Sequence, residues 1–205
     1  MRAPIRFSPN VNKRTLVGRL AVSEPVKALE LARSIADPWY RCQSLAAVAW
    51  RLKDPRQLKT VIGEALEAAY EHTEPNRIVS VASWPIRAMV EKRDRRLSSA
   101  VDELLQKIET EPNPVRRGDA LLLLFQAVYS DPPLRAPVLE SLLRSCEQMN
   151  SWKRPIILSD LATILAVDDP SLAEQVIQMI GEGQSSRRAR RYIAAGQALG
   201  PREFF

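Results

Sequence analysis

A recurring acid–proline pair constrains the fold of this chain more than any other feature. Seven of its 15 prolines directly follow an acidic residue, at Glu24-Pro25, Asp37-Pro38, Asp54-Pro55, Glu74-Pro75, Glu111-Pro112, Asp131-Pro132 and Asp169-Pro170. An Asp side chain accepts a hydrogen bond from the first turn of a helix, and proline at the first helical position lacks an N–H that would be unpaired there. The pairs therefore predict helix starts. Glu caps less well than Asp, so we expect it to act mainly through its charge.

A second pattern recurs every 34 to 40 residues and starts at an arginine, namely Arg41, Arg77, Arg117, Arg154 and Arg188. Apolar residues follow each anchor at offsets of four, seven and eleven, which places them along one side of a helix. These residues, here called the apolar stripe, are Leu45, Val48, Leu52, Val81, Trp84, Ala88, Leu121, Leu124, Val128, Leu158, Leu161, Leu165, Tyr192, Ala195 and Leu199.

The segments between the stripes also have helical apolar spacing, as in Ile62, Leu66 and Ala69. Each resulting helical hairpin has an apolar face that it cannot bury alone, and stacking against the next hairpin buries it. We therefore predict an all-α solenoid of about five hairpins over residues 23–200. Its repeats are expected at about 24–53, 54–92, 93–130, 131–168 and 169–200. Residues 1–22 are expected to form an N-terminal cap with a short helix from Thr15 to Leu20. Residues 201–205 are expected to form a tail after Gly200-Pro201 has ended the last helix.

The stretch LARSIADPWYRCQSLAAVAWRL (Leu31 to Leu52) resembles bacterial HEAT-like helical repeats, with an acid–proline turn followed by arginine and small apolar residues. The resemblance covers roughly residues 24–200. The other repeats keep the arginine and the apolar positions, but the turns within the fourth and fifth repeats lack the acid–proline pair. The resemblance implies a right-handed α-α superhelix. The Trp-x-x-Leu-Gly-x-x-Tyr pattern of tetratricopeptide repeats and the Thr-Pro-Leu-His pattern of ankyrin repeats are absent.

The charge balance favours an acidic partner without naming one. The net charge is +6 and the sequence pI is about 9.6. A basic surface attracts phosphate, nucleic acid or acidic proteins, but the acids of this chain lie in the same segments as its bases. No apolar run approaches the roughly 20 residues of a membrane span. The N-terminus also lacks the apolar stretch of a signal peptide. We therefore expect a cytoplasmic protein with no membrane partner.

The first two repeats share a polar motif, because Arg41, Ser44 and Arg51 match Arg77, Ser80 and Arg87 at identical spacing. Adjacent repeats would bring the four arginines together, where they could hold a phosphate or carboxylate of a partner. The alternative is a solvated face balanced by local acids.

The five anchor arginines lie in a first helical turn, where the helix dipole disfavours a cation. We expect a ladder in which each arginine pairs with an acid or carbonyl of a neighbouring turn. The alternative is that the anchors face an acidic ligand.

Arg187, Arg188, Arg190 and Arg191 form the densest basic cluster, and Lys92, Arg93, Arg95 and Arg96 form a second one. A basic edge of this kind could track a phosphate backbone. Against this, the interleaved aromatic residues of single-strand binders and any recognised DNA-binding motif are missing. The alternative for these runs is plain solvation.

Two aromatic features also stand out. Pro85 follows Trp84 inside a predicted helix, so it should leave the carbonyl near Val81 without its helical partner. Trp84 itself belongs to the stripe and is expected to pack in the core. The tail ends in Phe204-Phe205, which we expect to be exposed unless they fold back over the final repeat.

No catalytic constellation emerges from the sequence. The single histidine, His72, lies in a predicted turn with no paired Ser or Cys. Cys42 and Cys146 are far apart and have no zinc spacing. We expect no enzyme, metal or cofactor. The sequence favours a non-catalytic scaffold for protein–protein interaction. The alternative is nucleic-acid binding through the arginine edge, and an enzyme in a groove near Trp84-Pro85 is the least favoured.

Overall fold

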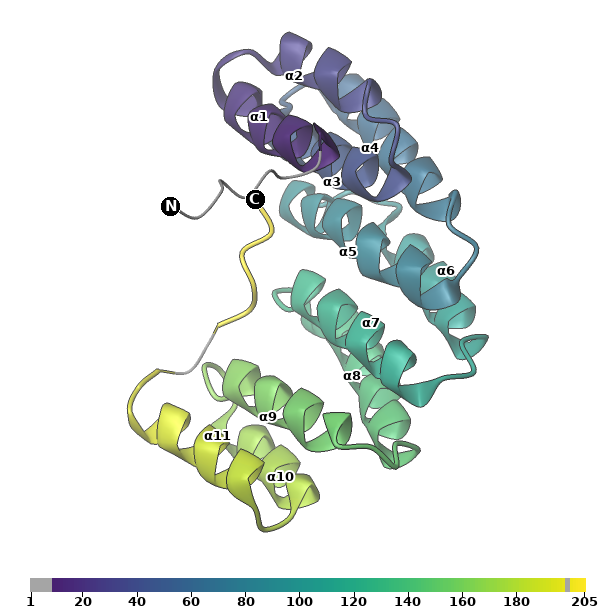
Figure 1. Ribbon diagram of the computed structural model, residues 1–205. Coiled ribbons are helices and arrows are strands. Elements are labelled where there is room, and N and C mark those ends of the chain that lie inside the picture. Colours follow the sequence, from purple (N-terminus) through teal and green to yellow (C-terminus); the bar gives the residue numbers. More distant parts are fainter. Residues whose placement is uncertain (1–8, 198–199) are drawn as a thin grey trace, which may run out of the picture. The chain divides into compact units, whose positions relative to one another are not determined.

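The computed structural model describes residues 9–197 and 200–205, and these residues contain eleven helices and no strand (Figure 1). The predicted all-α class is therefore confirmed. The helices are α1 (Pro9–Ser23), α2 (Pro25–Arg33), α3 (Pro38–Arg51), α4 (Pro55–Tyr70), α5 (Pro75–Lys92), α6 (Leu97–Glu109), α7 (Pro114–Ala127), α8 (Pro132–Glu147), α9 (Lys153–Leu165), α10 (Pro170–Ile180) and α11 (Gln184–Ala194).

The helices form two compact units. The first comprises the chain up to Leu104 together with Phe204 and Phe205, and the second comprises residues 105–203. In the first unit α3 packs between α1 and α5, while α2 contacts α1 and α3, and α4 contacts α3 and α5. In the second unit α9 packs against both α7 and α11, while α8 contacts α7 and α9, and α10 contacts α9 and α11. Each unit thus has the packing of a helical bundle or repeat.

The acid–proline pairs start helices as predicted, with one exception. Asp37, Asp54, Asp131 and Asp169 each accept a hydrogen bond from a backbone N–H of the first turn, whereas the side chains of Glu24 and Glu74 do not. The expected difference between Asp and Glu is therefore confirmed.

The exception is Glu111-Pro112, where the prediction is wrong. Helix α7 begins two residues later, at Pro114, and the Asn113 side chain accepts from the backbone N–H groups of Val115 and Arg116. Glu111 is only 3 % exposed, and its carboxylate accepts from the Asn113 backbone N–H at 3.1 Å. An amide caps as well as a carboxylate does. Glu111 instead stabilises the turn that precedes the helix.

The apolar stripe forms the core in the first four repeats. All twelve stripe residues from Leu45 to Leu165 are buried, and the least buried of them, Leu52 and Trp84, are each 8 % exposed. In the last repeat Tyr192 is half-buried and Ala195 is exposed, while Leu199 lies outside the described residues. Helix α11 ends at Ala194, and Gly196 follows with a φ of 65° that favours glycine. The last helix therefore ends earlier than the sequence pattern predicts.

The N-terminal segment contains a longer helix than expected. Helix α1 covers 15 residues instead of the predicted six from Thr15 to Leu20. Only Val17 and Ala21, one turn apart, are buried in it. A polar contact adds to this narrow apolar contact, because the Arg14 side chain donates to the Gln43 side chain of α3 at 2.8 Å. A helix with so narrow an apolar side gives a weak sequence signal.

The proline inside α5 leaves a carbonyl whose partner comes from another helix. Pro85 lies within the helix, and the Val81 carbonyl accepts from the Cys42 thiol of α3 at 3.4 Å. Burial raises the pKa of the Cys42 thiol, so the sulfur keeps the proton that this contact needs. The prediction of a carbonyl freed near Val81 is confirmed, and the thiol compensates for part of the lost helical hydrogen bond.

The helix caps give a direct test of the acid–proline rule. Replacing Asp37 with Ala removes hydrogen bonds to the backbone N–H groups of Trp39 and Tyr40, at 2.9 and 3.3 Å. We expect the free energy of unfolding to fall by about 1 kcal/mol. Glu24→Ala is the matched control and should cost clearly less, because the Glu24 side chain makes no cap hydrogen bond. Urea unfolding followed by circular dichroism measures both, and equal losses would contradict the distinction.

Candidate functional site

The anchor arginine Arg41 ties two hairpins together. It lies in the first turn of α3, and its Nη1 donates to the carbonyls of Ile35 and Ala36, both at 2.9 Å. Its Nη2 forms an ion pair with Glu71, which caps the C-terminus of α4. The cation thus reaches away from the positive end of α3 to the carbonyls of the preceding turn and to a carboxylate at a helix C-terminus.

Two other anchors each make one part of this arrangement: Arg117 reaches the next hairpin, and Arg154 bonds a carbonyl of the preceding helix. Arg117 donates to the side chain of Gln148, the residue that caps the C-terminus of α8. Arg154 donates through Nε to the Cys146 carbonyl at 3.0 Å. The predicted pairing with an acid or carbonyl of a neighbouring turn is therefore confirmed at Arg41 and Arg154, whereas Arg117 bonds a side-chain amide instead.

Arg77 also pairs with an acid of the preceding turn, as predicted, whereas Arg188 departs from the prediction. Arg77 Nε lies 3.9 Å from Glu74 Oε2, and both side chains are about half exposed. The Arg188 guanidinium lies over the Tyr192 ring, 5.4 Å from its centroid. Neither contact joins successive hairpins.

The six residues of the shared polar motif do not form one cluster. Arg41 and Arg77 lie in the first turns of α3 and α5, and their counterparts Arg51 and Arg87 lie ten residues further along the same helices. Ten residues of α-helix span about 15 Å. The motif therefore supplies two arginines near each end of the helices rather than four in one place.

Neither serine of the motif is exposed. Ser44 is 1 % exposed and lies beneath the surface, and Ser80 is half-buried. The equivalent positions in the third and fourth repeats are core residues, namely Ala120, Ala127, Ile157 and Ile164. Residues three and ten positions after an anchor arginine thus lie at the border of the core. Their exposure to solvent differs from repeat to repeat.

Each arginine of the motif has a partner within the chain. Arg41 pairs with Glu71, Arg77 is near Glu74, and Arg87 pairs with Glu91 one turn away. Arg51 is exposed and covers the Trp50 ring, with its guanidinium carbon 4.1 Å from the ring centroid. Local carboxylates therefore offset much of the charge that an acidic ligand would need.

The predicted basic edge is exposed, because Arg187, Arg188, Arg190 and Arg191 are all solvent-accessible on α11. Arg190 forms an ion pair with Glu174 of α10 at 2.7 Å. Arg187 donates through Nε to the Gly183 carbonyl at 3.2 Å. Arg187 and Arg190 line a hollow of about 480 Å³, but Glu182 also contributes to its wall.

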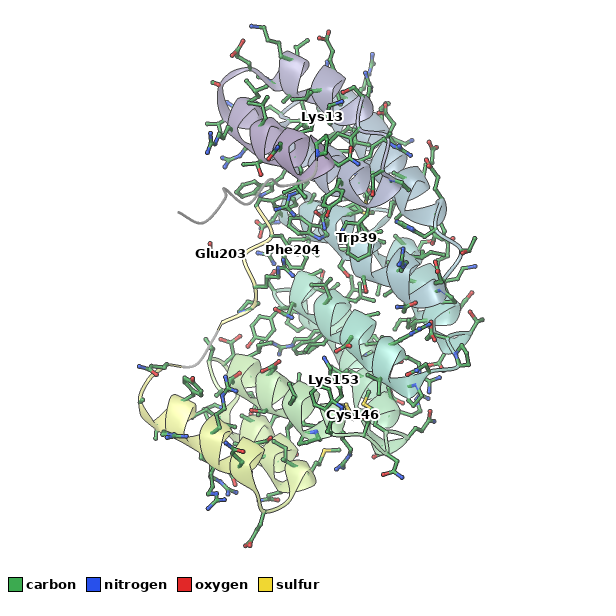
Figure 2. The ribbon with its side chains drawn as sticks, in the orientation of Figure 1. Lys13, Trp39, Cys146, Lys153, Glu203 and Phe204 are labelled. Atoms are coloured by element: carbon green, nitrogen blue, oxygen red, sulfur yellow. The ribbon has the colours of Figure 1, made fainter. Side chains whose placement is uncertain are left out.

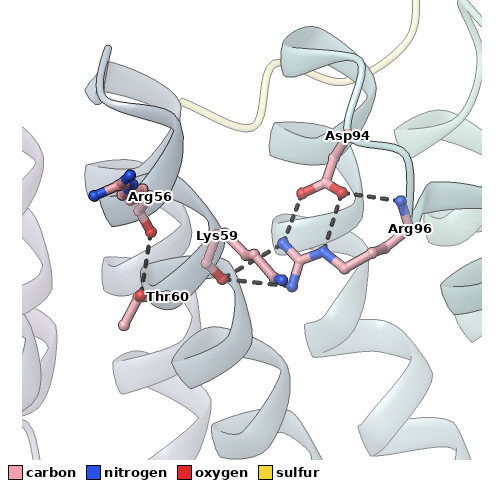
Figure 3. Close-up of polar contacts among 5 residues, drawn as sticks. All are labelled: Arg56, Lys59, Thr60, Asp94 and Arg96. Carbon is pink, nitrogen blue, oxygen red and sulfur yellow. Dashed lines mark hydrogen bonds and ion pairs between the residues drawn. The ribbon is translucent and has the colours of Figure 1, made fainter.

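The second basic run stabilises turns. Lys92 donates to the Leu52 carbonyl at the end of α3 at 2.9 Å. Arg96 bonds the Asp94 carboxylate at 3.0 and 2.6 Å, and both of its terminal nitrogens lie 3.4 Å from the Lys59 carbonyl of α4 (Figure 3). The Arg96 guanidinium holds the pKa of the Asp94 carboxyl below its usual value. Lys92 thus joins α5 to the end of α3, and Arg96 joins the turn before α6 to α4.

An aromatic cluster, not anticipated from the sequence, joins the tail to the first unit. The Phe205 ring stacks on Trp50 with centroids 5.0 Å apart, and the Phe204 ring meets Trp84 edge-on at 5.3 Å. Phe204, labelled in Figure 2, is only 5 % exposed. The tail aromatics are thus neither exposed nor packed on the final repeat. The sequence signal that could have indicated this cluster was Trp84 itself. It occupies a stripe position that Val48, Leu124 and Leu161 occupy in other repeats.

The single histidine packs against an aromatic ring, and both cysteines are buried. Within residues 9–197 and 200–205, no group of three or more His, Cys, Asp or Glu side chains is placed to hold a metal ion. The His72 ring meets the Trp39 ring edge-on at 5.9 Å. Cys42 and Cys146 are both buried. Over the same residues, none of the helices is both long and apolar enough to cross a membrane.

The two kinds of anchor arginine predict a stability difference. Arg41→Gln removes contacts to two carbonyls and to Glu71, so we expect a loss of about 1–3 kcal/mol in the free energy of unfolding. Arg77→Gln, at a matched position, should change that free energy by less than about 0.5 kcal/mol. Denaturant titration of both variants measures this. If Arg77→Gln proved as costly as Arg41→Gln, the structural role of the ladder would be refuted.

Comparison with known proteins adds no relative. No family model matches the sequence, and no curated protein or solved structure matches it. The functional assignment therefore rests on the contacts of the chain's own residues.

Proposed function

We propose that this chain is a HEAT-like helical-repeat scaffold, a right-handed α-α superhelix of about five hairpins that binds another protein and catalyses no reaction. Support comes from the repeated packing within each unit and from the ladder contacts of Arg41 and Arg117, which join equivalent parts of successive hairpins. In such a fold the core positions repeat while the surface is free to differ, and one face serves as the binding surface.

One observation carries the binding role. The layer formed by α3 and α5 holds a non-helical segment of chain, because Phe204 and Phe205 pack on Trp84 and Trp50. Tryptophan and arginine are enriched among the residues that dominate binding energy in protein interfaces. Here Trp50 lies beside the exposed Arg51, which supplies such a pair on the surface of the scaffold.

A second candidate function is nucleic-acid binding through the arginine edge. The observation that favours it is the exposure of all four arginines of α11, from Arg187 to Arg191. Phosphate contacts release counterions, so the affinity for DNA or RNA would fall steeply with salt. A flat salt response, or no binding at low salt, would remove this candidate.

Site-specific photo-cross-linking in the native host tests the scaffold function. A photoreactive amino acid at Arg51, on the α3 layer, is expected to form a cross-link to a discrete protein. The same probe at Glu67, exposed on α4, is the matched control and should give much less product. Protein cross-links of equal yield from both positions, or cross-links to nucleic acid alone, would contradict the proposal.

A further inference from the structure

Trp50 and Trp84, which we call the aromatic platform, come from neighbouring helices of the first unit. Trp50 is half-buried near the end of α3, and Trp84 is 8 % exposed in the middle of α5. Helices α3 and α5 pack directly against each other. The platform therefore rests on two helices that pack together directly.

The contacts to the platform involve two adjacent aromatic residues with different geometries. Phe205 stacks on Trp50 with an interplanar angle of 20°, and it also meets Trp84 edge-on at 5.8 Å. Phe204 meets Trp84 edge-on at an interplanar angle of 79°. All three centroid distances lie in the range of favourable aromatic pairs. Both rings of this adjacent pair thus contact the platform.

The segment that carries the rings has no regular secondary structure. Residues 202–205 belong to no helix, and Arg202 donates its backbone N–H to the Gln126 side chain in the second unit. The platform is thus occupied by a short peptide without regular secondary structure. A segment of another protein with the same two side chains would present the same rings to Trp50 and Trp84.

We propose that the aromatic platform is a docking site for partner segments that carry two adjacent aromatic residues, and that Phe204-Phe205 occupies it as a tethered competitor. This inference rests on the proposed scaffold function and names the chemistry of the partner. A tethered segment acts at an effective concentration in the millimolar range, so it weakens binding of a free peptide without preventing it.

The test uses purified full-length protein and a fluorescent peptide of sequence Pro-Arg-Glu-Phe-Phe, with its C-terminus amidated so that no terminal carboxylate contributes. Fluorescence anisotropy is measured with the wild-type chain and with the double variant Phe204→Ala/Phe205→Ala. We expect the variant to bind the peptide at least tenfold more tightly than the wild type, because its platform is vacant. Equal affinities, or no binding to the variant, would overturn the proposal.

Matched controls assign the binding to the platform. The peptide Pro-Arg-Glu-Ala-Ala should not bind. Adding Trp50→Leu to the double variant should reduce affinity at least tenfold, whereas adding Trp152→Leu should leave it unchanged, because Trp152 is 72 % exposed in the second unit. Equal effects of the two tryptophan substitutions would overturn the assignment.

A second readout needs no change in the platform. With 5-fluorotryptophan incorporated, the ¹⁹F resonances of Trp50 and Trp84 should shift in the Phe204→Ala/Phe205→Ala variant and return toward their wild-type positions when the peptide is added. The proposal would be refuted if the resonances did not shift when the peptide was added. It would also be refuted if the wild-type chain were a dimer and the Phe204→Ala/Phe205→Ala variant a monomer. The peptide-binding experiment on purified protein tests the docking chemistry, and the cross-linking experiment in cells tests the scaffold function. Because either experiment can fail without the other, the two proposals are tested separately.

Discussion

Burial of the apolar stripe is the constraint on which the rest of this structure depends. The stripe at offsets of four, seven and eleven from each anchor arginine runs along one side of a helix, so a single hairpin cannot cover it. In the structure the neighbouring helices cover it: α3 lies between α1 and α5, and α9 packs against α7 and α11. Full burial of one such leucine or valine contributes about 1.5–3 kcal/mol. The twelve buried stripe residues therefore contribute a large part of the stability of these helices.

Polar contacts then fix how successive hairpins meet. Arg41 and Arg117 each bond a residue that caps the C-terminus of the next hairpin's first helix, Glu71 and Gln148. Arg33 joins two first helices in a related way, since it makes a bidentate pair with Glu64 at 2.8 and 2.7 Å. These contacts have a directional geometry that apolar packing lacks, so they select one register between hairpins. These contacts also pair arginines within the chain that the sequence pattern alone would leave available to a ligand.

The sequence predicts the helical class, most helix starts and the stripe, because these depend on local rules. Asp caps, proline at the first turn and apolar spacing all act within a few residues, as at Asp37-Pro38. Prediction from the sequence fails where contacts between residues far apart in the chain determine the structure. Glu111 is buried in a turn instead of starting a helix, and Ser44 lies beneath the surface instead of beside Arg41 on an open face. The platform formed by Trp50, Trp84 and the tail joins residues more than a hundred positions apart, which no periodic pattern encodes.

Hydrogen exchange on the intact chain tests the central claim that stripe burial organises the helices. Amide protection reports the free energy of local opening, and it should follow how completely each stripe is covered. We predict the slowest exchange in α3, α5, α7 and α9, whose stripes are buried, and markedly faster exchange in α11, where Tyr192 is half-buried and Ala195 is exposed. Protection in α11 equal to that in α3, or uniform protection across all of these helices, would contradict the account.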